Sequence, residues 1–201
     1  MAKKHPSPEL QRRDPQNRRQ RVLEIAARSF ADRGYEATSV NDVAADSGVS
    51  VGALYKYFVD KPALLEAVLA EQETEFVDAI SDPEIQRGPH LDRIQPMMKA
   101  LFRLAATKSP FFWALTSGTH ALRGRREQSP GSALRGALAT FVEEGIAARE
   151  FRSVDAEKMA ALAFGTIESA IRPWLASGAP EAERKTWSRL VSDVLTRSLE
   201  R

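Results

Sequence analysis

The sequence predicts an all-α protein. Ala, Leu, Glu and Arg recur at helical spacing along most of the 201 residues, and no stretch alternates β-branched and polar side chains as a half-buried strand would. Start and stop signals divide the chain into segments of the length usual for globular helices. Because 43% of the residues are hydrophobic, the chain can also bury a core. We therefore expect about nine helices and no β-sheet.

The first 61 residues predict three helices whose ends are marked in the sequence. Each begins after a residue whose side chain can accept a hydrogen bond from the first turn, and the first two end at a glycine. The start markers are Asp14 with Pro15, Ser39 with Asp42 in a capping box, and Ser50, and the end markers are Gly34 and Gly48. The second and third helices are short and are joined by a tight turn at 47–49. They predict a helix-turn-helix, which lays its second helix in the major groove of DNA.

The third helix, at 50–58, has an apolar inner face and small residues on its outer face. Leu54 and Phe58 are four residues apart, so they share the side that packs inward. The outer face is left to Val51, Gly52, Ala53, Tyr55, Lys56 and Tyr57. Small side chains let a backbone approach base edges, methyl groups contact thymine, and a lysine reaches guanine or a phosphate. The alternative is that both tyrosines pack in the core and Lys56 is only a solvated charge. Burying both tyrosines in addition to Leu54 and Phe58 would surround this helix with core on all sides.

Beyond residue 60 the sequence predicts one long helix and then a bundle of further helices. Asp60 can cap the long helix, and Asp82-Pro83 ends it. Apolar residues keep the helical period between these two points. Further helices are expected at 91–107, 109–122, 132–149, 155–177 and 181–199.

The stretch GYEATSVNDVAADSGVSVGALYKYFVDKPALLEAV resembles the N-terminal DNA-binding region of TetR-family transcriptional regulators. The resemblance extends without a gap over residues 18–69. It implies a recognition helix at 50–58, with phosphate contacts at the start of the second and of the fourth helix. The residues expected to contact DNA are Thr38, Ser39, Ser50, Val51, Gly52, Ala53, Tyr55, Lys56, Tyr57 and Lys61. Val59 and Pro62 depart from the family pattern, where Pro and Glu are frequent, and Val51 replaces a residue that is often polar.

The last two predicted helices resemble the pair through which TetR-like proteins form a four-helix bundle between two subunits. Small residues on the first helix would permit close approach, and an apolar stripe follows the second. These are Ala160, Ala161, Ala163 and Gly165, then Trp187, Leu190, Val191, Val194 and Leu195. The alternative is that both helices complete the core of the monomer. We expect the dimer, because a helix-turn-helix protein reads two half-sites with two-fold symmetry.

By the same resemblance, the middle helices should enclose an effector. The candidate residues are bulky or polar side chains between 97 and 168, namely Phe102, Phe111, Phe112, Trp113, Thr116, His120, Phe141, Phe164 and Glu168. Aromatic residues at helical spacing also form ordinary cores, so both interpretations stay open. Glu168 is either a polar anchor for the effector or the partner of Arg172 in an ion pair at i, i+4.

These observations predict a basic, disordered arm at 1–15, a helix-turn-helix domain at 16–61, and an effector-binding and dimerisation domain at 62–201. Residues 1–61 hold eleven Lys and Arg against eight Asp and Glu, which suits contact with DNA. The sequence has no cysteine, no metal-ligand spacing of histidines and no catalytic motif, so we expect neither an enzyme nor a cofactor or metal. No apolar run is long enough for a membrane span, and a cytoplasmic protein is expected.

The predicted function is a transcriptional repressor that binds a palindromic operator as a homodimer and is released by a small, largely apolar effector. The alternative function is a helical ligand-binding or scaffold protein that does not bind an operator. Lys56, Tyr57 and Lys61 favour the DNA-binding function, because a scaffold has no need of them in this arrangement.

Overall fold

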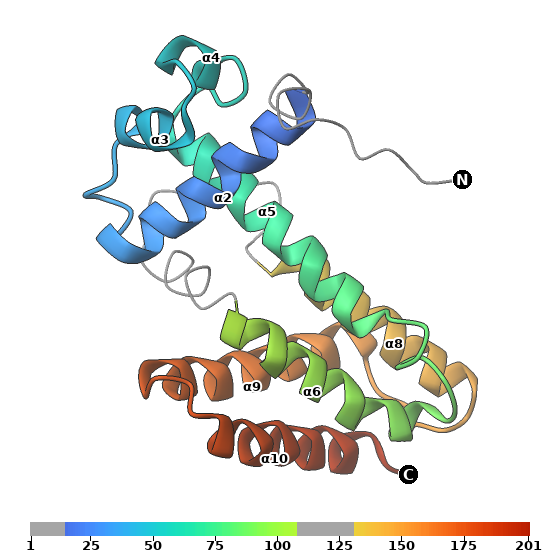
Figure 1. The fold of residues 1–201 in the computed structure, drawn as a ribbon. Coiled ribbons are helices and arrows are strands. Elements are labelled where there is room, and N and C mark those ends of the chain that lie inside the picture. Colours follow the sequence, from blue (N-terminus) through green and yellow to red (C-terminus); the bar gives the residue numbers. More distant parts are fainter. Residues whose placement is uncertain (1–14, 108–130) are drawn as a thin grey trace, which may run out of the picture. The chain divides into compact units, whose positions relative to one another are not determined.

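A computed structural model describes residues 15–107 and 131–201 (Figure 1). These residues form eight α-helices, and no strand occurs among them, which confirms the predicted all-α fold. They divide into two compact units, one of residues up to 70 and one of residues from 71 onward, so the division falls within a single helix, α5. The arm predicted at 1–15, apart from Pro15, and the helix predicted at 109–122 lie outside the described residues.

The first unit contains three helices and the start of a fourth. They are α2 (Pro15–Arg33), α3 (Val40–Ser47), α4 (Val51–Tyr55) and α5 (Lys61–Ile80). α2 ends where predicted, before Gly34, and α3 ends at Gly48, whose left-handed backbone (φ 68°) favours glycine. The N–H of Gly48 donates to the carbonyl groups of the last turn of α3. The turn between α3 and α4 is therefore tight, as a helix-turn-helix requires.

The core of the first unit is formed by the apolar stripes of these short helices. α3 packs against both α2 and α4. The buried side chains include Val22, Ala26, Phe30, Tyr35, Val43, Leu54, Phe58, Leu64 and Leu65. Each short helix is too small to be stable alone, so its orientation is set by the residues that it buries here.

The second unit is a bundle of longer helices. Its members, besides the end of α5, are α6 (His90–Thr107), α8 (Ser132–Ala147), α9 (Ala156–Ala176) and α10 (Glu181–Leu199). α6 packs along α10, and α8 packs along α9 (Figure 1). Each begins and ends within two residues of the predicted bounds. The largest buried side chains of this unit include Phe102, Trp174 and Phe151, with the Phe102 and Trp174 ring centres 5.4 Å apart.

The N-terminus of α8 is capped by a residue distant in sequence. Glu73, on α5, is 6% exposed, and its carboxylate accepts hydrogen bonds from the backbone N–H groups of Gly131 at 2.6 Å and Ala133 at 3.3 Å. A carboxylate at a helix N-terminus is favoured by the helix dipole and satisfies free N–H groups. This contact fixes α5 to α8 inside the second unit. None of the described helices is long and apolar enough to cross a membrane.

Candidate nucleic-acid interface and effector cavity

The orientation of α4 is fixed by one cap and two buried side chains. The hydroxyl of Ser50 accepts a hydrogen bond from the backbone N–H of Ala53 at 3.2 Å, as the sequence predicts. Leu54 is fully buried and Phe58 is 3% exposed. Because Leu54 holds one side of the helix against the core and Phe58 holds the turn that follows, Val51, Gly52, Tyr55 and Lys56 are left on the exposed side.

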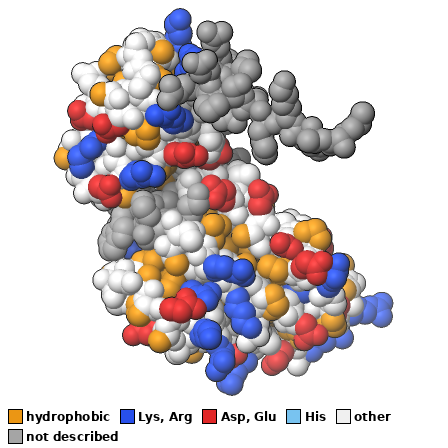
Figure 2. Space-filling model, in the orientation of Figure 1, with side chains coloured by type: hydrophobic (Ala, Val, Ile, Leu, Met, Phe, Trp, Pro, Cys, Tyr) orange, Lys and Arg blue, Asp and Glu red, His pale blue; other side chains and the backbone are white. Residues whose placement is uncertain are grey.

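The outer face of α4 carries the small residues and the polar aromatic side chains expected there. Val51 is 36% exposed and Tyr55 is 48% exposed, and hydrophobic side chains reach the surface in the region of α4 (Figure 2). Gly52 and Lys56 are also exposed, whereas Ala53 and Tyr57 are half-buried. No atom lies within 4 Å of a Cβ placed on Gly52. The core interpretation of Tyr55 is therefore wrong, and Tyr57 lies at the edge of the core, beside Phe58.

α4 is shorter than the helix predicted at 50–58. Its regular part ends at Tyr55, and Lys56 forms the C-cap. The chain then continues in a turn, because the N–H groups of Tyr57 and Phe58 both donate to the carbonyl of Leu54, at 2.9 and 3.0 Å. This turn brings Phe58 into the core and leaves Val59 76% exposed.

The N-terminus of α3 is held by the predicted capping box. The Ser39 hydroxyl accepts from the N–H of Asp42 at 3.1 Å and donates to its carboxylate at 2.7 Å, and the N–H of Ser39 donates to the same carboxylate at 3.0 Å. The hydrogen bond from the Ser39 side chain is the main reason why the pKa of Asp42 is lowered. Ser39 is exposed at the end of α3, where helix N–H groups favour a phosphate.

Thr38 is placed differently from the expectation that its side chain contacts phosphate. The residue is 1% exposed, and its hydroxyl donates toward the backbone carbonyls of Ser29 at 3.0 Å and Gly34 at 2.9 Å. The buried hydroxyl ties the turn before α3 to the end of α2. We correct the assignment accordingly: the side chain of Thr38 supports the turn and is not presented to a DNA backbone.

Two basic side chains lie against aromatic rings near α4 and α5. The guanidinium of Arg19, on α2, lies 5.6 Å from the centre of the Phe58 ring. The ammonium of Lys61, the first residue of α5, lies 4.2 Å from the centre of the Tyr35 ring and donates to the Glu36 carbonyl at 3.2 Å. Both distances are in the range of cation–π contacts. In the sequence Arg19 is visible only as part of the basic N-terminal region, and no local signal places it beside Phe58.

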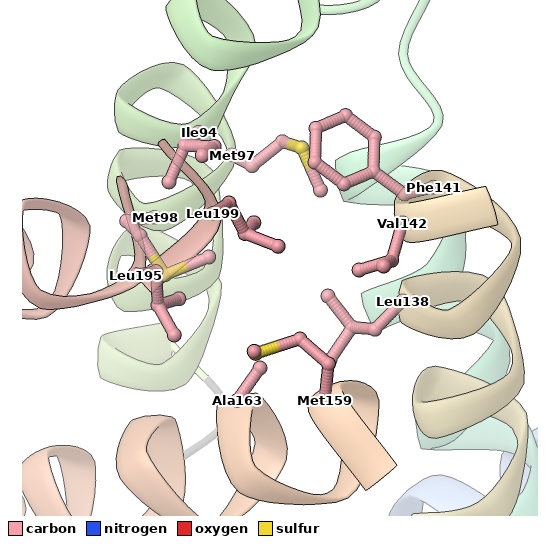
Figure 3. A pocket seen from close by; sticks show the side chains of 10 residues that line it. All are labelled: Ile94, Met97, Met98, Leu138, Phe141, Val142, Met159, Ala163, Leu195 and Leu199. Carbon is pink, nitrogen blue, oxygen red and sulfur yellow. The ribbon is translucent and has the colours of Figure 1, made fainter. Parts of the chain in front are cut away.

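The second unit encloses a small apolar cavity of about 20 Å³. Side chains from α6, α8, α9 and α10 point toward one another around it (Figure 3). They are Ile94, Met97, Met98, Leu138, Phe141, Val142, Met159, Ala163, Leu195 and Leu199. A volume of this size holds about one water molecule, and the lining offers no polar partner for one. In this conformation the cavity accommodates no organic effector, but three of its lining residues are flexible methionines that can repack.

One of the residues predicted to contact an effector lines this cavity, namely Phe141. Phe102 is fully buried against Trp174, and Phe164 is half-buried with the Arg135 guanidinium 5.2 Å from its ring centre. Glu168 lies 3.8 Å from Arg172 in the ion pair that the sequence offered as the alternative, and its side chain is 37% exposed. The other predicted residues lie outside the described part of the chain: Phe111, Phe112, Trp113, Thr116 and His120.

Most of the cavity lining was missed because it is assembled from four helices. Met97 and Met98 belong to the bulky stretch visible in the sequence, but nothing local distinguishes Leu138 or Leu199 from other core residues. Ala163 and Leu195 were counted in the dimer surface, yet they face the interior of the subunit at 6% and 7% exposure. The spacing of apolar residues shows that a side chain is buried, but not what it faces.

A polar cluster borders the cavity at the start of α6. His90 is buried, its ring centre lies 5.6 Å from that of Phe141, and its Nδ1 lies 3.2 Å from a carboxylate oxygen of Glu150. The backbone N–H of His90 donates to the other oxygen of Glu150, which is the main cause of the lowered pKa of that carboxyl group. Within 15–107 and 131–201, no group of side chains has the composition of a metal site.

The outer faces of α9 and α10 expose apolar side chains. Leu162 is 67% exposed, Leu190 is 52% exposed and Val194 is 45% exposed. A Cβ on Gly165 would meet no atom within 4 Å. The apolar stripe predicted on α10 is therefore divided, because Val191 and Leu195 face the core of the subunit while Leu190 and Val194 face away from it.

Comparison with known proteins also finds regulatory proteins that resemble the helix-turn-helix unit of this chain. The sequence model described as bacterial regulatory proteins, tetR family, matches residues 22–68. The HTH-type transcriptional repressor KstR2 of Mycolicibacterium smegmatis is 44% identical over 57 residues, which are 28% of this chain and 28% of that protein. The HTH-type transcriptional repressor AcnR of Corynebacterium glutamicum is 36% identical over 77 residues, 37% of this chain and 41% of that protein. The chain thus aligns with less than half the length of these curated relatives.

Solved structures share the fold along most of the chain. The TetR family transcriptional regulator PfmR from Thermus thermophilus matches with a TM-score of 0.66 and 27% identity, over 90% of this chain and 100% of that one. The fatty acid degradation regulator FadR from Bacillus halodurans matches with a TM-score of 0.78 over 96% of this chain and 97% of that one, and its 18% identity shows a likeness of fold alone. With the helix-turn-helix geometry, the match over residues 22–68 shows that the N-terminal unit is of the kind found in the tetR family of bacterial regulatory proteins, and the rest of the chain shares the fold of the solved structures.

Proposed function

We propose that this protein is a transcriptional repressor that binds a two-fold symmetric operator as a homodimer and responds to a small, largely apolar effector. The observation that carries the proposal is the outer face of α4. Leu54, on α4, and Phe58, in the turn after it, are committed to the core, while Val51, Gly52 and Lys56 remain exposed. A helix presented in this way at the second position of a helix-turn-helix is suited to enter the major groove.

The residues of this surface are proposed to have two kinds of role. Val51, Gly52 and Ala53 face base edges, where their small size permits close approach and their methyl groups contact thymine. Tyr55, Lys56 and Tyr57 contact phosphates or guanine, and Ser39, Ser50 and Lys61 contribute backbone contacts from the helix ends. The small residues would set sequence preference, and the polar residues would supply most of the affinity.

Selection from random DNA tests operator binding. The purified protein is mixed with a library of random duplexes at moderate salt, and bound duplexes are amplified over several rounds. We expect enrichment of a motif with two inverted half-sites about one helical turn apart, because each subunit would present one α4. A library that stays random after several rounds would instead favour a ligand-binding or scaffold protein.

The dimer is proposed to form through the outer faces of α9 and α10. Leu162, Leu190 and Val194 form an exposed apolar surface of the kind that marks protein interfaces. The space at Gly165 would allow a partner helix to approach closely. In this proposal residues 16–61 would read the operator, and residues 62–201 would bind the effector and form the dimer. Binding of chromosomal DNA would place the protein in the cytoplasm.

The effector is proposed to insert its apolar part among α6, α8, α9 and α10, where every residue lining the cavity is apolar. Support for a ligand with a long apolar chain comes from the fold, since FadR from Bacillus subtilis, with a TM-score of 0.72, was crystallised with stearoyl-CoA. Such a ligand would release DNA only by binding the DNA-free conformation more tightly than the DNA-bound one. A screen of apolar compounds by thermal unfolding tests this, with release of labelled operator as the second measurement. Neither stabilisation nor release by any compound would contradict the sensor function.

A further inference from the structure

The ammonium of Lys61 is held against the turn that precedes α3. Its Nζ donates a hydrogen bond to the Glu36 carbonyl at 3.2 Å, and it lies 4.2 Å from the centre of the Tyr35 ring. The first contact is a hydrogen bond from an ionised donor, and the second is a cation–π interaction. Together they tie the first residue of α5 to a turn 25 residues earlier in the chain.

The aromatic partner of this contact is itself buried in the core of the first unit. Tyr35 is 4% exposed, and its ring centre lies 5.4 Å from that of Phe30 on α2. The same turn is fixed at its other end by the buried hydroxyl of Thr38. Ser39, the N-cap of α3, follows directly. The place of the α3 N-terminus therefore depends on how firmly this turn is held.

We infer that Lys61 is a positioning residue for operator binding, because its ammonium fixes the Tyr35–Glu36 turn and so sets where the N-terminus of α3 meets the DNA backbone. This inference rests on the proposed function and adds to the phosphate contact proposed for the same lysine. An ammonium group has three donors, so the bond to Glu36 leaves others for a phosphate. The positioning role and the phosphate contact can be tested separately, because the Tyr35 ring takes part only in the positioning of the turn.

A double-mutant cycle between Tyr35 and Lys61 separates the roles. Tyr35→Leu removes the buried ring, Lys61→Met keeps the aliphatic stem without the charge, and Tyr35→Phe keeps the ring as the control. Affinity for the selected operator is measured at several salt concentrations. We expect Tyr35→Leu to lose about three- to tenfold in operator affinity per subunit of the dimer, the size of one cation–π contact, with an unchanged salt slope. Tyr35→Phe should stay within about twofold of wild type.

The coupling between the two positions decides the inference. Per subunit of the dimer, Lys61→Met should cost about three- to tenfold less in the Tyr35→Leu background than in wild type, because the ring contact is already absent there. Equal costs in the two backgrounds would overturn the positioning role while leaving the proposed function intact. A wild type that binds no DNA at all would overturn both.

Stability is followed by thermal unfolding, because Tyr35 is a core residue. If Tyr35→Leu does not fold, pentafluorophenylalanine at position 35 provides the same test, since it keeps the size of the ring but removes the negative face that attracts a cation. This variant should then lose operator affinity about threefold or more relative to Tyr35→Phe, with an unchanged salt slope. Equal affinity of the two ring variants would contradict the inference.

Discussion

Replacing Gly52 by valine tests whether α4 lies against base edges. Apart from the neighbouring backbone of its own helix, nothing lies within 4 Å of a Cβ at this position, and its φ is not in the left-handed region, so a side chain added here begins in open space. Valine is also a better helix former than glycine by a few tenths of a kcal/mol, roughly. Any loss of function must therefore arise where the new side chain meets DNA.

The expected loss follows from the number of contacts that the side chain would displace. One base contact contributes about 1 to 3 kcal/mol of discrimination, and a dimer presents two α4 helices, so about 2 to 6 kcal/mol should be lost. This corresponds to a fall of between about 30-fold and 20,000-fold in operator affinity. The phosphate contacts remain, so affinity for random DNA and its dependence on salt should change little.

Fluorescence anisotropy with labelled operator and scrambled duplexes measures both affinities. Gly136→Val is the matched control, because Gly136 is also an exposed glycine of a helix with no atom within 4 Å of its Cβ. We expect the control to bind both duplexes as the wild type does. If Gly52→Val retained full operator specificity with a normal circular dichroism spectrum, α4 would not be the recognition helix.

Three further predictions concern packing, assembly and pH. Gly145→Ala should lower the free energy of unfolding by about 1 to 3 kcal/mol, because the new methyl would overlap the buried ring of Phe151; an unchanged Tm would contradict this packing. Gly165→Arg should give monomers by light scattering that bind operator poorly, and a persisting dimer would place the interface elsewhere. Asp42→Asn should lower Tm at neutral pH. The lowered pKa of Asp42 means that its ionised carboxylate stabilises the folded protein. This stabilisation is present above the pKa that Asp42 has in the unfolded chain, and it is lost as pH falls through the folded pKa. The difference from wild type should therefore narrow below about pH 4, and a constant difference would show that the charge is not involved.

Much of the fold was predictable because helix ends are local features. Ser39, Asp42 and Ser50 make the caps that their spacing predicts, and Gly48 adopts the left-handed backbone that ends α3. The outer face of α4 was also predictable, since Leu54 and Phe58 leave only one orientation for a short helix. The sequence match to the family also lies in this region, at residues 22–68, where the motif is dense.

Features that depend on tertiary contacts were not predictable. Glu73 caps a helix that begins 58 residues later, and no local signal pairs them. Thr38 stands beside Ser39, yet one hydroxyl is buried and the other is exposed, because the turn before α3 folds back on α2. The cavity draws on four helices, so its lining depends on how they pack and not on their individual patterns.

Titrating the wild type into two duplexes tests whether a dimer of this chain reads a symmetric operator through α4. One duplex carries the motif recovered by selection, and the other is a scrambled sequence of the same composition. We expect saturation at two subunits, or a multiple of two, per operator, a preference of at least about 1,000-fold over the scrambled duplex, and affinity for both duplexes that falls as salt rises. Equal affinity for the two duplexes, or saturation at one subunit per operator, would contradict this expectation.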